Sequence, residues 1–245
     1  MKTVNLSILS SLLVLFTYCS SSVDIEYETK GVKVSTSYIF EVLEFNPKYF
    51  EFGVSEGRPT NTDFYINSNF FDQGSIPRGQ VVVDGKEKYG KQRSKKIEKK
   101  GGFFYVKNGK PYVRSKNCPS YTDYCSQSVF WGIDNGVFNT LLLTEPHAKL
   151  RNFRTLIGEN KKGEIILIVS KIPLDVKTIL DFSKDYNLVD AIFCDGGTSV
   201  DYYFDNGKYF STFKSIPDIF KIWSQKISFI KSIDFPPVYI TGSFK

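Results

Sequence analysis

Short runs of mainly apolar residues recur along most of the chain and are separated by turn residues. Such runs predict β-strands, and in the run 154–158 a period of two sets alternate residues on one face. They cover residues 38–45, 63–67, 80–83, 103–106, 112–113, 137–144, 154–158, 164–170, 189–194, 202–204 and 209–210. Asn108-Gly109 and Asn206-Gly207, which separate four of these runs, are dipeptides that favour tight hairpin turns. The pattern therefore predicts a protein built mainly from strands.

One segment has helical spacing instead. Its apolar residues fall on one side, with charged residues opposite: Val176, Ile179, Leu180, Phe182 and Tyr186. This stripe predicts a helix that packs on the core, beginning after Pro173. Because the helix lies between the strands at 165–169 and 189–194, the unit resembles a strand-helix-strand crossover, which predicts parallel strands and places Asp195 at a carboxyl end. A shorter helix is predicted over 218–223.

The chain is long and apolar enough to form one substantial domain. It has 245 residues, of which 41% are hydrophobic and 16% aromatic, and such a composition supports a packed core. No internal repeat or long linker divides residues 23–245. We expect a single domain of the α+β class, with a strand-rich mixed sheet and a few covering helices.

The N-terminus has the pattern of an export signal. Lys2 precedes an apolar run over 6–16, which is too short to span a membrane but typical of a signal peptide. Residues 1–22 are therefore assigned to a signal, with two endings open. Cleavage after residues 20–22 would give a secreted protein, whereas lipid attachment at Cys19, which we favour although Tyr18 is large for a lipobox, would give a cell-envelope lipoprotein. Contact with a membrane is expected through that anchor alone.

The cysteines and the histidine limit the available chemistry. In an exported protein Cys118 and Cys125, which bracket a polar loop, are expected to form a disulfide, with two reduced thiols as the alternative. No cysteine spacing suggests a zinc site. His147 is the sole histidine and falls in a predicted loop, so a multi-histidine metal site is excluded. An exposed or locally bonded side chain is the favoured interpretation of His147, rather than a catalytic base.

The positive charge does not indicate a nucleic-acid partner. The net charge is +6, and the excess is concentrated in residues 91–100, a polar run that is typical of a solvated loop. It has neither interleaved aromatic residues nor a nucleic-acid-binding motif. We therefore expect no binding of DNA or RNA.

The segment 188–199 is the strongest candidate for a ligand site. An apolar strand runs directly into Asp195, followed by Gly196, Gly197 and two hydroxyl residues, Thr198 and Ser199. Glycine lets the chain turn sharply and lets a ligand approach its N–H groups, which suits an anion. An ordinary turn is the alternative that remains open.

Two further segments carry groups that could bind such a ligand. Asn67 and Asn69 follow an apolar strand, where binding groups commonly lie. The alternation after Arg154 sets its side chain on one face with Gly158, from which a guanidinium could hold a phosphate in bidentate fashion. A surface arginine fits that pattern equally well.

Taken together and in this order, five groups of segments resemble the phosphodiester glycosidase family, which includes the enzyme that uncovers mannose 6-phosphate by removing N-acetylglucosamine. The segments are 66–72, 78–86, 127–128, 152–158 with 162–169, and 190–199. The resemblance covers roughly residues 63–208. It implies hydrolysis of a sugar-1-phosphodiester, small or polymeric, which releases the sugar and leaves a phosphomonoester.

The resemblance also implies roles for individual residues. The positions that match its motifs are Asn67, Asn69, Arg154, Asp195, Gly196, Gly197 and Ser199, and Gln127 and Thr198 are added as substrate-binding residues. Arg154 and the glycine N–H groups would bind the phosphate, and Asp195 would act as the nucleophile or as the acid-base group, which is left open. The chain departs from the family where Gln127-Ser128 leads into Val129-Phe130-Trp131 rather than a Gly-Pro pair, and at Thr198, where a third small residue is usual. These departures bear on which substrate is used.

The second function considered is a non-catalytic surface lipoprotein that binds carbohydrate or an anionic polysaccharide. Aromatic side chains that could stack on sugar rings are Tyr121, Tyr124, Phe130, Trp131, Tyr202 and Tyr203. No cofactor is expected. Asp72, Asp195 and Asp201 could bind calcium, but their spacing matches no EF-hand loop.

Overall fold

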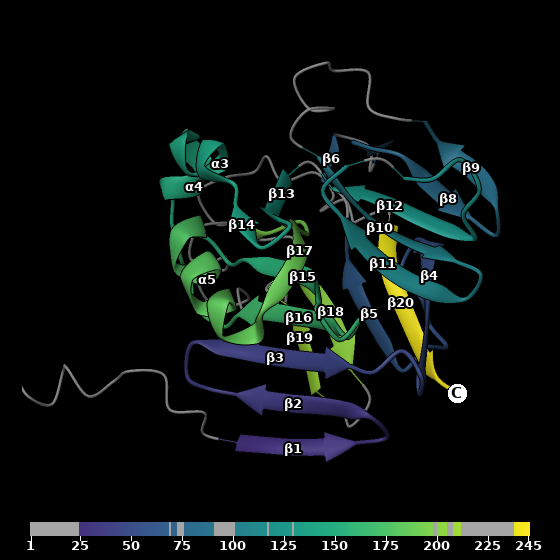
Figure 1. The fold of residues 1–245 in the computed structure, drawn as a ribbon, viewed down its shortest axis with the longest axis horizontal. Helices are drawn as coiled ribbons and strands as arrows, with labels where there is room; N and C mark the ends of the chain where they lie inside the picture. The colour runs from purple at the N-terminus through teal and green to yellow at the C-terminus, as the bar shows by residue number, and fades with distance from the viewer. Residues whose placement is uncertain are drawn as a thin grey trace, which may run out of the picture.

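The computed structural model describes residues 25–68, 70–72, 76–90, 101–116, 118–128, 130–197, 200–204, 208–211 and 238–245. One large sheet forms the centre of the molecule, with the helices against one of its faces and the smaller sheets beyond the other (Figure 1). This arrangement confirms the predicted strand-rich α+β class.

The large sheet has eight strands in the order β1-β2-β3-β16-β15-β17-β13-β14, and every neighbouring pair is antiparallel. The strands are β1 (Ile25–Thr29), β2 (Val32–Thr36), β3 (Phe40–Phe45), β13 (Phe130–Asp134), β14 (Val137–Phe138), β15 (Thr155–Asn160), β16 (Ile165–Ser170) and β17 (Leu188–Phe193).

Two five-stranded sheets pack beyond this one. The first has the order β11-β10-β12-β8-β9 and the second the order β19-β18-β5-β20-β4. Their strands are β4 (Phe50–Glu56), β5 (Phe64–Asn67), β8 (Val81–Val83), β9 (Lys86–Tyr89), β10 (Gly102–Lys107), β11 (Lys110–Arg114), β12 (Tyr124–Ser128), β18 (Asp201–Phe204), β19 (Lys208–Ser211) and β20 (Val238–Phe244). A short ribbon pairs β6 (Phe71–Asp72) with β7 (Ile76–Pro77).

The strand β16 separates two hydrophobic cores. Ile165, Leu167 and Val169 point into the core between the sheets, whereas Ile166 and Ile168 point into the core beneath the helices. Because successive side chains of a strand point to opposite faces, a strand covered on both faces is apolar at every position. This explains the unbroken apolar run in the sequence.

The helix α5 (Val176–Ser183) lies where its periodicity predicted it. Asp175 caps its first turn by accepting a hydrogen bond from the Thr178 N–H at 2.8 Å, and Val176, Ile179 and Leu180 are buried. A one-turn 3-10 helix, η1 (Lys184–Tyr186), follows it.

The predicted crossover gives the correct relative direction of the strands β16 and β17, but it does not predict that a third strand lies between them. β15 pairs antiparallel with both β16 and β17, so these two strands are parallel to each other but not adjacent. The chain therefore passes over α5 and returns to the far side of β15. Asp195 lies just beyond the carboxyl end of β17, as predicted.

Two local predictions are wrong. The strand predicted over 137–144 ends at Phe138, because the Asn139 side chain accepts from the Leu142 N–H at 3.1 Å and starts the short helix α3 (Thr140–Thr144). His147 is not in a loop but in a one-turn helix, α4 (Pro146–Lys149), which begins with a proline at its first position. The helix predicted over 218–223 and the turn at 206–207 lie outside the described residues.

The predicted disulfide between Cys118 and Cys125 is also absent from the described structure. Both side chains are buried in a small cluster with Phe103 and Tyr105, and Cys118 Sγ lies 3.7 Å from Thr122 Oγ1. Hydrogen bonds at Asp123 hold the loop between the cysteines, since its carbonyl accepts from the Gly85 N–H and its own N–H donates to the Val106 carbonyl.

The proposed signal, residues 1–22 with Cys19, lies outside the described residues. In the part of the chain that the structure describes, no helix is both long and apolar enough to cross a membrane.

Candidate active site

The carboxyl end of β17 forms the sharp turn that the sequence predicts. After the buried Cys194, the Asp195 carboxylate accepts a hydrogen bond from the Gly196 N–H at 2.9 Å, and the Gly197 N–H donates to the Phe153 carbonyl at 2.8 Å. A Cβ atom at Gly196 would lie 2.7 Å from that carbonyl oxygen, and Gly197 has a φ of +72°. The first glycine is therefore required by close approach and the second by its backbone conformation.

These hydrogen bonds correct one expectation. The N–H groups of Gly196 and Gly197 were predicted to bind a phosphate, but both donate to groups of the protein itself. Asp195 is 7% exposed. The hydrogen bonds therefore fix the turn around the carboxylate, and they engage the two glycine N–H groups within the protein.

A cavity of about 470 Å³ opens beside this turn. Its walls come from α3, α4, the start of α5, the start of β13 and the end of β17, at the upper edge of the large sheet in Figure 1. The residues that line it are Phe70, Arg78, Phe130, Leu142, Glu145, His147, Asn152, Arg154, Val176, Phe193, Cys194, Gly196 and Gly197. Its size is in the range of small-molecule sites.

Arg154 lines this cavity, and its guanidinium binds the backbone. Its Nη2 donates to the carbonyls of His147 at 2.8 Å and Leu150 at 2.7 Å, and its Nε donates to the carbonyl of Leu174 at 3.2 Å. Burial lowers the pKa of Arg154, with Asp175 opposing the shift. Because both Nη2 hydrogens and the Nε hydrogen are used, the predicted bidentate grip on a phosphate is not open in this conformation. No described residue accepts a hydrogen bond from Nη1, which leaves its two hydrogens for a ligand.

Three rings form the apolar wall of the cavity. The rings of Phe70 and Phe130 meet edge to face at 5.9 Å between centroids, and the imidazole of His147 lies 4.7 Å from the Phe130 ring. Phe130 belongs to the segment Val129-Phe130-Trp131, where the resemblance leads one to expect a Gly-Pro pair. This segment therefore contributes a ring to the cavity wall.

Asn67 and Gln127 are buried beside the site rather than in the cavity lining. Gln127 accepts a hydrogen bond from the Gln80 N–H through Oε1 at 2.9 Å, which attaches β12 to the segment before β8. Asn67, the last residue of β5, is fully buried. Neither residue is therefore open to a ligand in the cavity.

Serine hydroxyls join these segments to the Asp195 turn. Ser126 Oγ donates to Ser68 Oγ at 2.8 Å, linking β12 to the end of β5. Ser128 Oγ donates to the Phe193 carbonyl, linking β12 to the end of β17. Through these bonds the structure brings the Asn67, Gln127 and Asp195 segments to one place.

Several predicted residues cannot be placed. Asn69, Thr198 and Ser199 lie outside the described residues, as do the side chains of Asp72 and Asp201. Cys194 is buried, and its burial raises the pKa of the thiol, which disfavours the thiolate that a nucleophile would need. In the described part of the chain, no group of three metal-ligating side chains is positioned to hold an ion.

Arg78 and Glu145 are cavity residues that the sequence reasoning did not single out. Arg78 is exposed, and its backbone N–H donates to the Phe70 carbonyl at 2.7 Å, which fixes the base of the side chain at the cavity. Arg78 lies within a segment that resembles the family, but no spacing rule distinguished it from a surface arginine. Glu145 precedes the proline that starts α4, and nothing in the sequence marks it as a residue that lines the cavity.

Comparisons with known proteins agree with this fold. The phosphodiester glycosidase family model matches residues 60–222. The catalytic domain of zebrafish N-acetylglucosamine-1-phosphodiester alpha-N-acetylglucosaminidase, auto-inhibited by its pro-peptide, has a similar structure, with a TM-score of 0.57 at 15% identity over 92% of this chain and 85% of that one. A hypothetical protein from Synechocystis is similar with a TM-score of 0.53 at 12% identity, over 90% of this chain and 61% of that one. No curated protein sequence matches the chain.

At such identities the structural likeness concerns the fold, whereas the family model matches the sequence itself over more than half of the chain. The matched residues include the Asp195 turn, Arg154 and the cavity wall. The chain belongs to the phosphodiester glycosidase family.

Proposed function

We propose that the protein hydrolyses a glycosyl phosphodiester, releasing the sugar from its anomeric carbon and leaving a phosphomonoester. The observation that carries this proposal is the turn at Asp195, whose residues Cys194, Gly196 and Gly197 line a cavity that two arginines also line, while Asp195 itself is 7% exposed and is not a lining residue. A carboxylate serves the anomeric centre and guanidinium groups suit the phosphate. Family membership supports the same reaction class.

In this mechanism the arginines bind the leaving group. Arg78, which is exposed in the cavity, and the Nη1 of Arg154 would hold the phosphate oxygens and stabilise the charge that develops as the glycosidic bond breaks. The rings of Phe70, Phe130 and His147 would pack against the sugar. These contacts orient the anomeric carbon toward the Asp195 turn.

Two carboxyl groups are available for the chemical step. Asp195 would act as the nucleophile or as the acid-base group, and Glu145 is the carboxyl side chain in the cavity lining itself. Glycosidases commonly divide the two roles between such a pair. The stereochemistry of the released sugar, followed by NMR, distinguishes direct attack by water from a covalent intermediate.

The test uses purified protein with UDP-N-acetylglucosamine and with a synthetic N-acetylglucosamine-1-phosphodiester, and it measures released sugar. We expect Asp195→Asn to lower kcat by about 100-fold or more, because general acid-base and nucleophilic groups contribute on that order. The exposed carboxylate Asp185, on η1, supplies the matched control Asp185→Asn. Turnover by Asp195→Asn equal to that of the control would refute the assignment.

Binding without turnover is the second candidate, and the aromatic wall of the cavity favours it. In the same assay a binding protein would show saturable association with the phosphodiester and no released sugar above that of a buffer blank.

Export is also part of the proposal, supported by the apolar run over 6–16. Metabolic labelling with a fatty acid, compared between the wild type and Cys19→Ser, tests the lipid anchor.

A further inference from the structure

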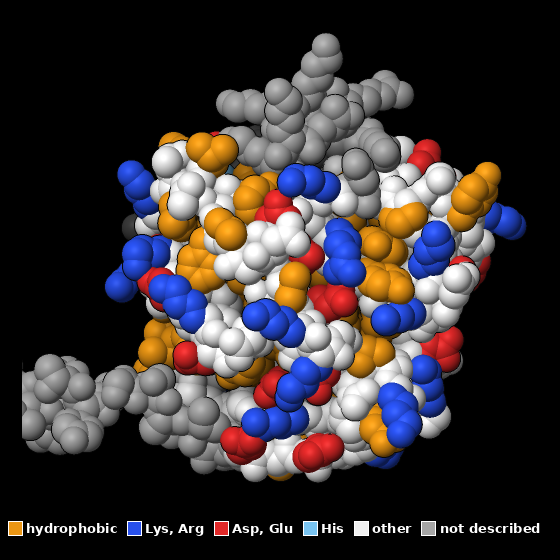
Figure 2. Space-filling view, viewed as in Figure 1, with side chains coloured by type: hydrophobic (Ala, Val, Ile, Leu, Met, Phe, Trp, Pro, Cys, Tyr) orange, Lys and Arg blue, Asp and Glu red, His pale blue; other side chains and the backbone are white. Residues whose placement is uncertain are grey.

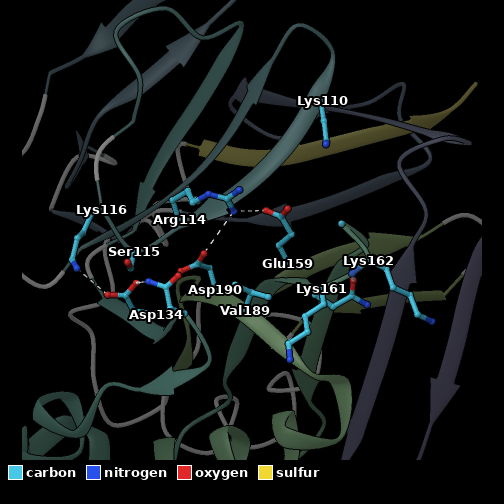
Figure 3. Close-up of a pocket in the computed structure, with 13 residues that line it drawn as sticks. Lys110, Arg114, Ser115, Lys116, Asp134, Glu159, Lys161, Lys162, Val189 and Asp190 are labelled. Atoms are coloured by element: carbon cyan, nitrogen blue, oxygen red, sulfur yellow. Dashed lines mark hydrogen bonds and ion pairs between the residues drawn. The ribbon is translucent and has the colours of Figure 1, made fainter.

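A second cavity, of about 600 Å³, lies away from the candidate active site and shares no lining residue with it. It is bounded by the edge strand β11, the start of β17, the turn after β13 and the hairpin turn between β15 and β16 (Figure 3). Nothing in the proposed reaction uses it.

The floor of this cavity is a fixed group of three charged side chains. Arg114 lies 2.5 Å from Glu159 and 3.6 Å from Asp190, and Glu159 also accepts a hydrogen bond from the Val113 N–H at 3.2 Å. Glu159 and Asp190 are 12% and 7% exposed at their side chains. Because these bonds hold the carboxylates in place, their remaining lone pairs are pre-oriented acceptors.

The rim of the cavity is basic. Lys110, Lys116, Lys161 and Lys162 are exposed around it, and Figure 3 shows them on different sides of the floor. Lys116 pairs with Asp134 at 3.1 Å. Among the described residues, no carboxylate lies within ion-pair distance of the other three lysines.

The charges leave the cavity positive. Its lining holds five basic side chains and three carboxylates, so the formal net charge of the lining is +2. Figure 2, drawn from the same side as Figure 1, shows lysine and arginine side chains gathered around acidic ones near the middle of this face. Lysines on a rim of this kind attract a phosphate as mobile point charges.

We propose that this cavity is a second ligand site and that it binds a phosphorylated sugar. The rim lysines would hold the phosphate, and the carboxylates of Glu159 and Asp190 would accept hydrogen bonds from sugar hydroxyls. The volume matches the range of small-molecule sites. A phosphate without a sugar would contact only the rim lysines. A sugar without a phosphate would contact only the carboxylates of the floor. The site does not depend on catalysis in the other cavity.

Lysine acetylation followed by mass spectrometry locates the ligand in the wild-type protein. With glucose 1-phosphate as the probe, we expect Lys110, Lys161 and Lys162 to react about fivefold more slowly, because a lysine bound to phosphate is shielded from the reagent. The exposed lysines Lys48 and Lys86 serve as internal controls and should react at an unchanged rate. Glucose and inorganic phosphate, each alone, should protect the rim more weakly at equal concentration.

The charge-reversal variant K161E/K162E tests the rim, with K48E/K86E as a control of equal charge change. Protection of Lys110 should require about tenfold more glucose 1-phosphate in K161E/K162E, since two charge-assisted contacts are lost, and should shift less than about twofold in the control. Equal loss in both variants would show non-specific attraction and overturn the proposal. The proposal would also be overturned if glucose 1-phosphate did not slow the acetylation of the rim lysines.

Discussion

Arg154 lies in the candidate site as the sequence predicts, but the contacts of its guanidinium differ from the predicted ones. Its side chain reaches the cavity, but its guanidinium binds the carbonyls of His147, Leu150 and Leu174. Those carbonyls belong to α4, the residue after it and the segment before α5. Arg154 therefore holds the cavity wall together in addition to any contact with a ligand.

Replacing Arg154 and Arg78 separately distinguishes the structural role of an arginine in the cavity wall from its role in binding a ligand. Arg154→Lys should lower the free energy of unfolding by about 1–2 kcal/mol, because a lysine cannot bond all three carbonyls and two of these acceptors, His147 and Leu174, make partly buried hydrogen bonds. Arg78→Lys should leave the unfolding free energy unchanged and lower kcat/KM, since Arg78 is exposed in the cavity. Denaturant melts and kinetics on a sugar phosphodiester check both. If the two variants have the same stability, the structural role of Arg154 is wrong.

At the scale of elements, α5 is the part of the fold that its own sequence explains most fully. Asp175 accepts hydrogen bonds from both the N–H and the hydroxyl of Thr178, and Asp181 pairs with Lys177 and with Lys184. All these contacts lie within one turn or less of the helix. They therefore follow from spacing alone, and the helix could be predicted without knowing its neighbours.

The cap at Asp175 has a measurable consequence for the stability of the protein. Asp175→Ala should lower the free energy of unfolding by about 1 kcal/mol, the usual contribution of such a cap. The exposed residue Asp185 gives the control variant Asp185→Ala, which should change it by less than about 0.5 kcal/mol. Urea titrations followed by circular dichroism make the comparison. Equal effects would mean that the cap adds nothing beyond surface charge.

At the scale of the whole molecule, the large sheet separates two cores that share its central strands. Leu167 and Ile166 are neighbours on β16 and are both fully buried, one against the smaller sheets and the other against the helices. Each core contributes to the position of the Asp195 turn, because β17 also has side chains in both.

Truncation on either face of β16 should therefore be equally severe. Leu167→Ala and Ile166→Ala should each lower the free energy of unfolding by about 2–5 kcal/mol, the range for large buried aliphatic side chains. Leu141, which is 69% exposed on α3, supplies a control in Leu141→Ala. A variant on one face that behaves like this control would show that the corresponding core is not packed in solution.

The sequence determined the local features of this protein. Residue spacing was sufficient for α5 and for the Asn108-Gly109 hairpin, whose two residues have positive φ values. It also placed Asp195 after a buried strand, and the family motifs identified the segments that form the site. These features depend on contacts between residues that are close in the sequence, so residue spacing is enough to predict them.

The tertiary structure alone decided which segments meet. No local pattern could insert β15 between β16 and β17, because strand order depends on contacts between residues far apart in the sequence. For the same reason the sequence could not predict which carbonyls Arg154 binds, that Glu145 and Arg78 line one cavity, or that a second cavity forms around Arg114. Each depends on the final packing, in which backbone groups and charges from separate elements satisfy one another.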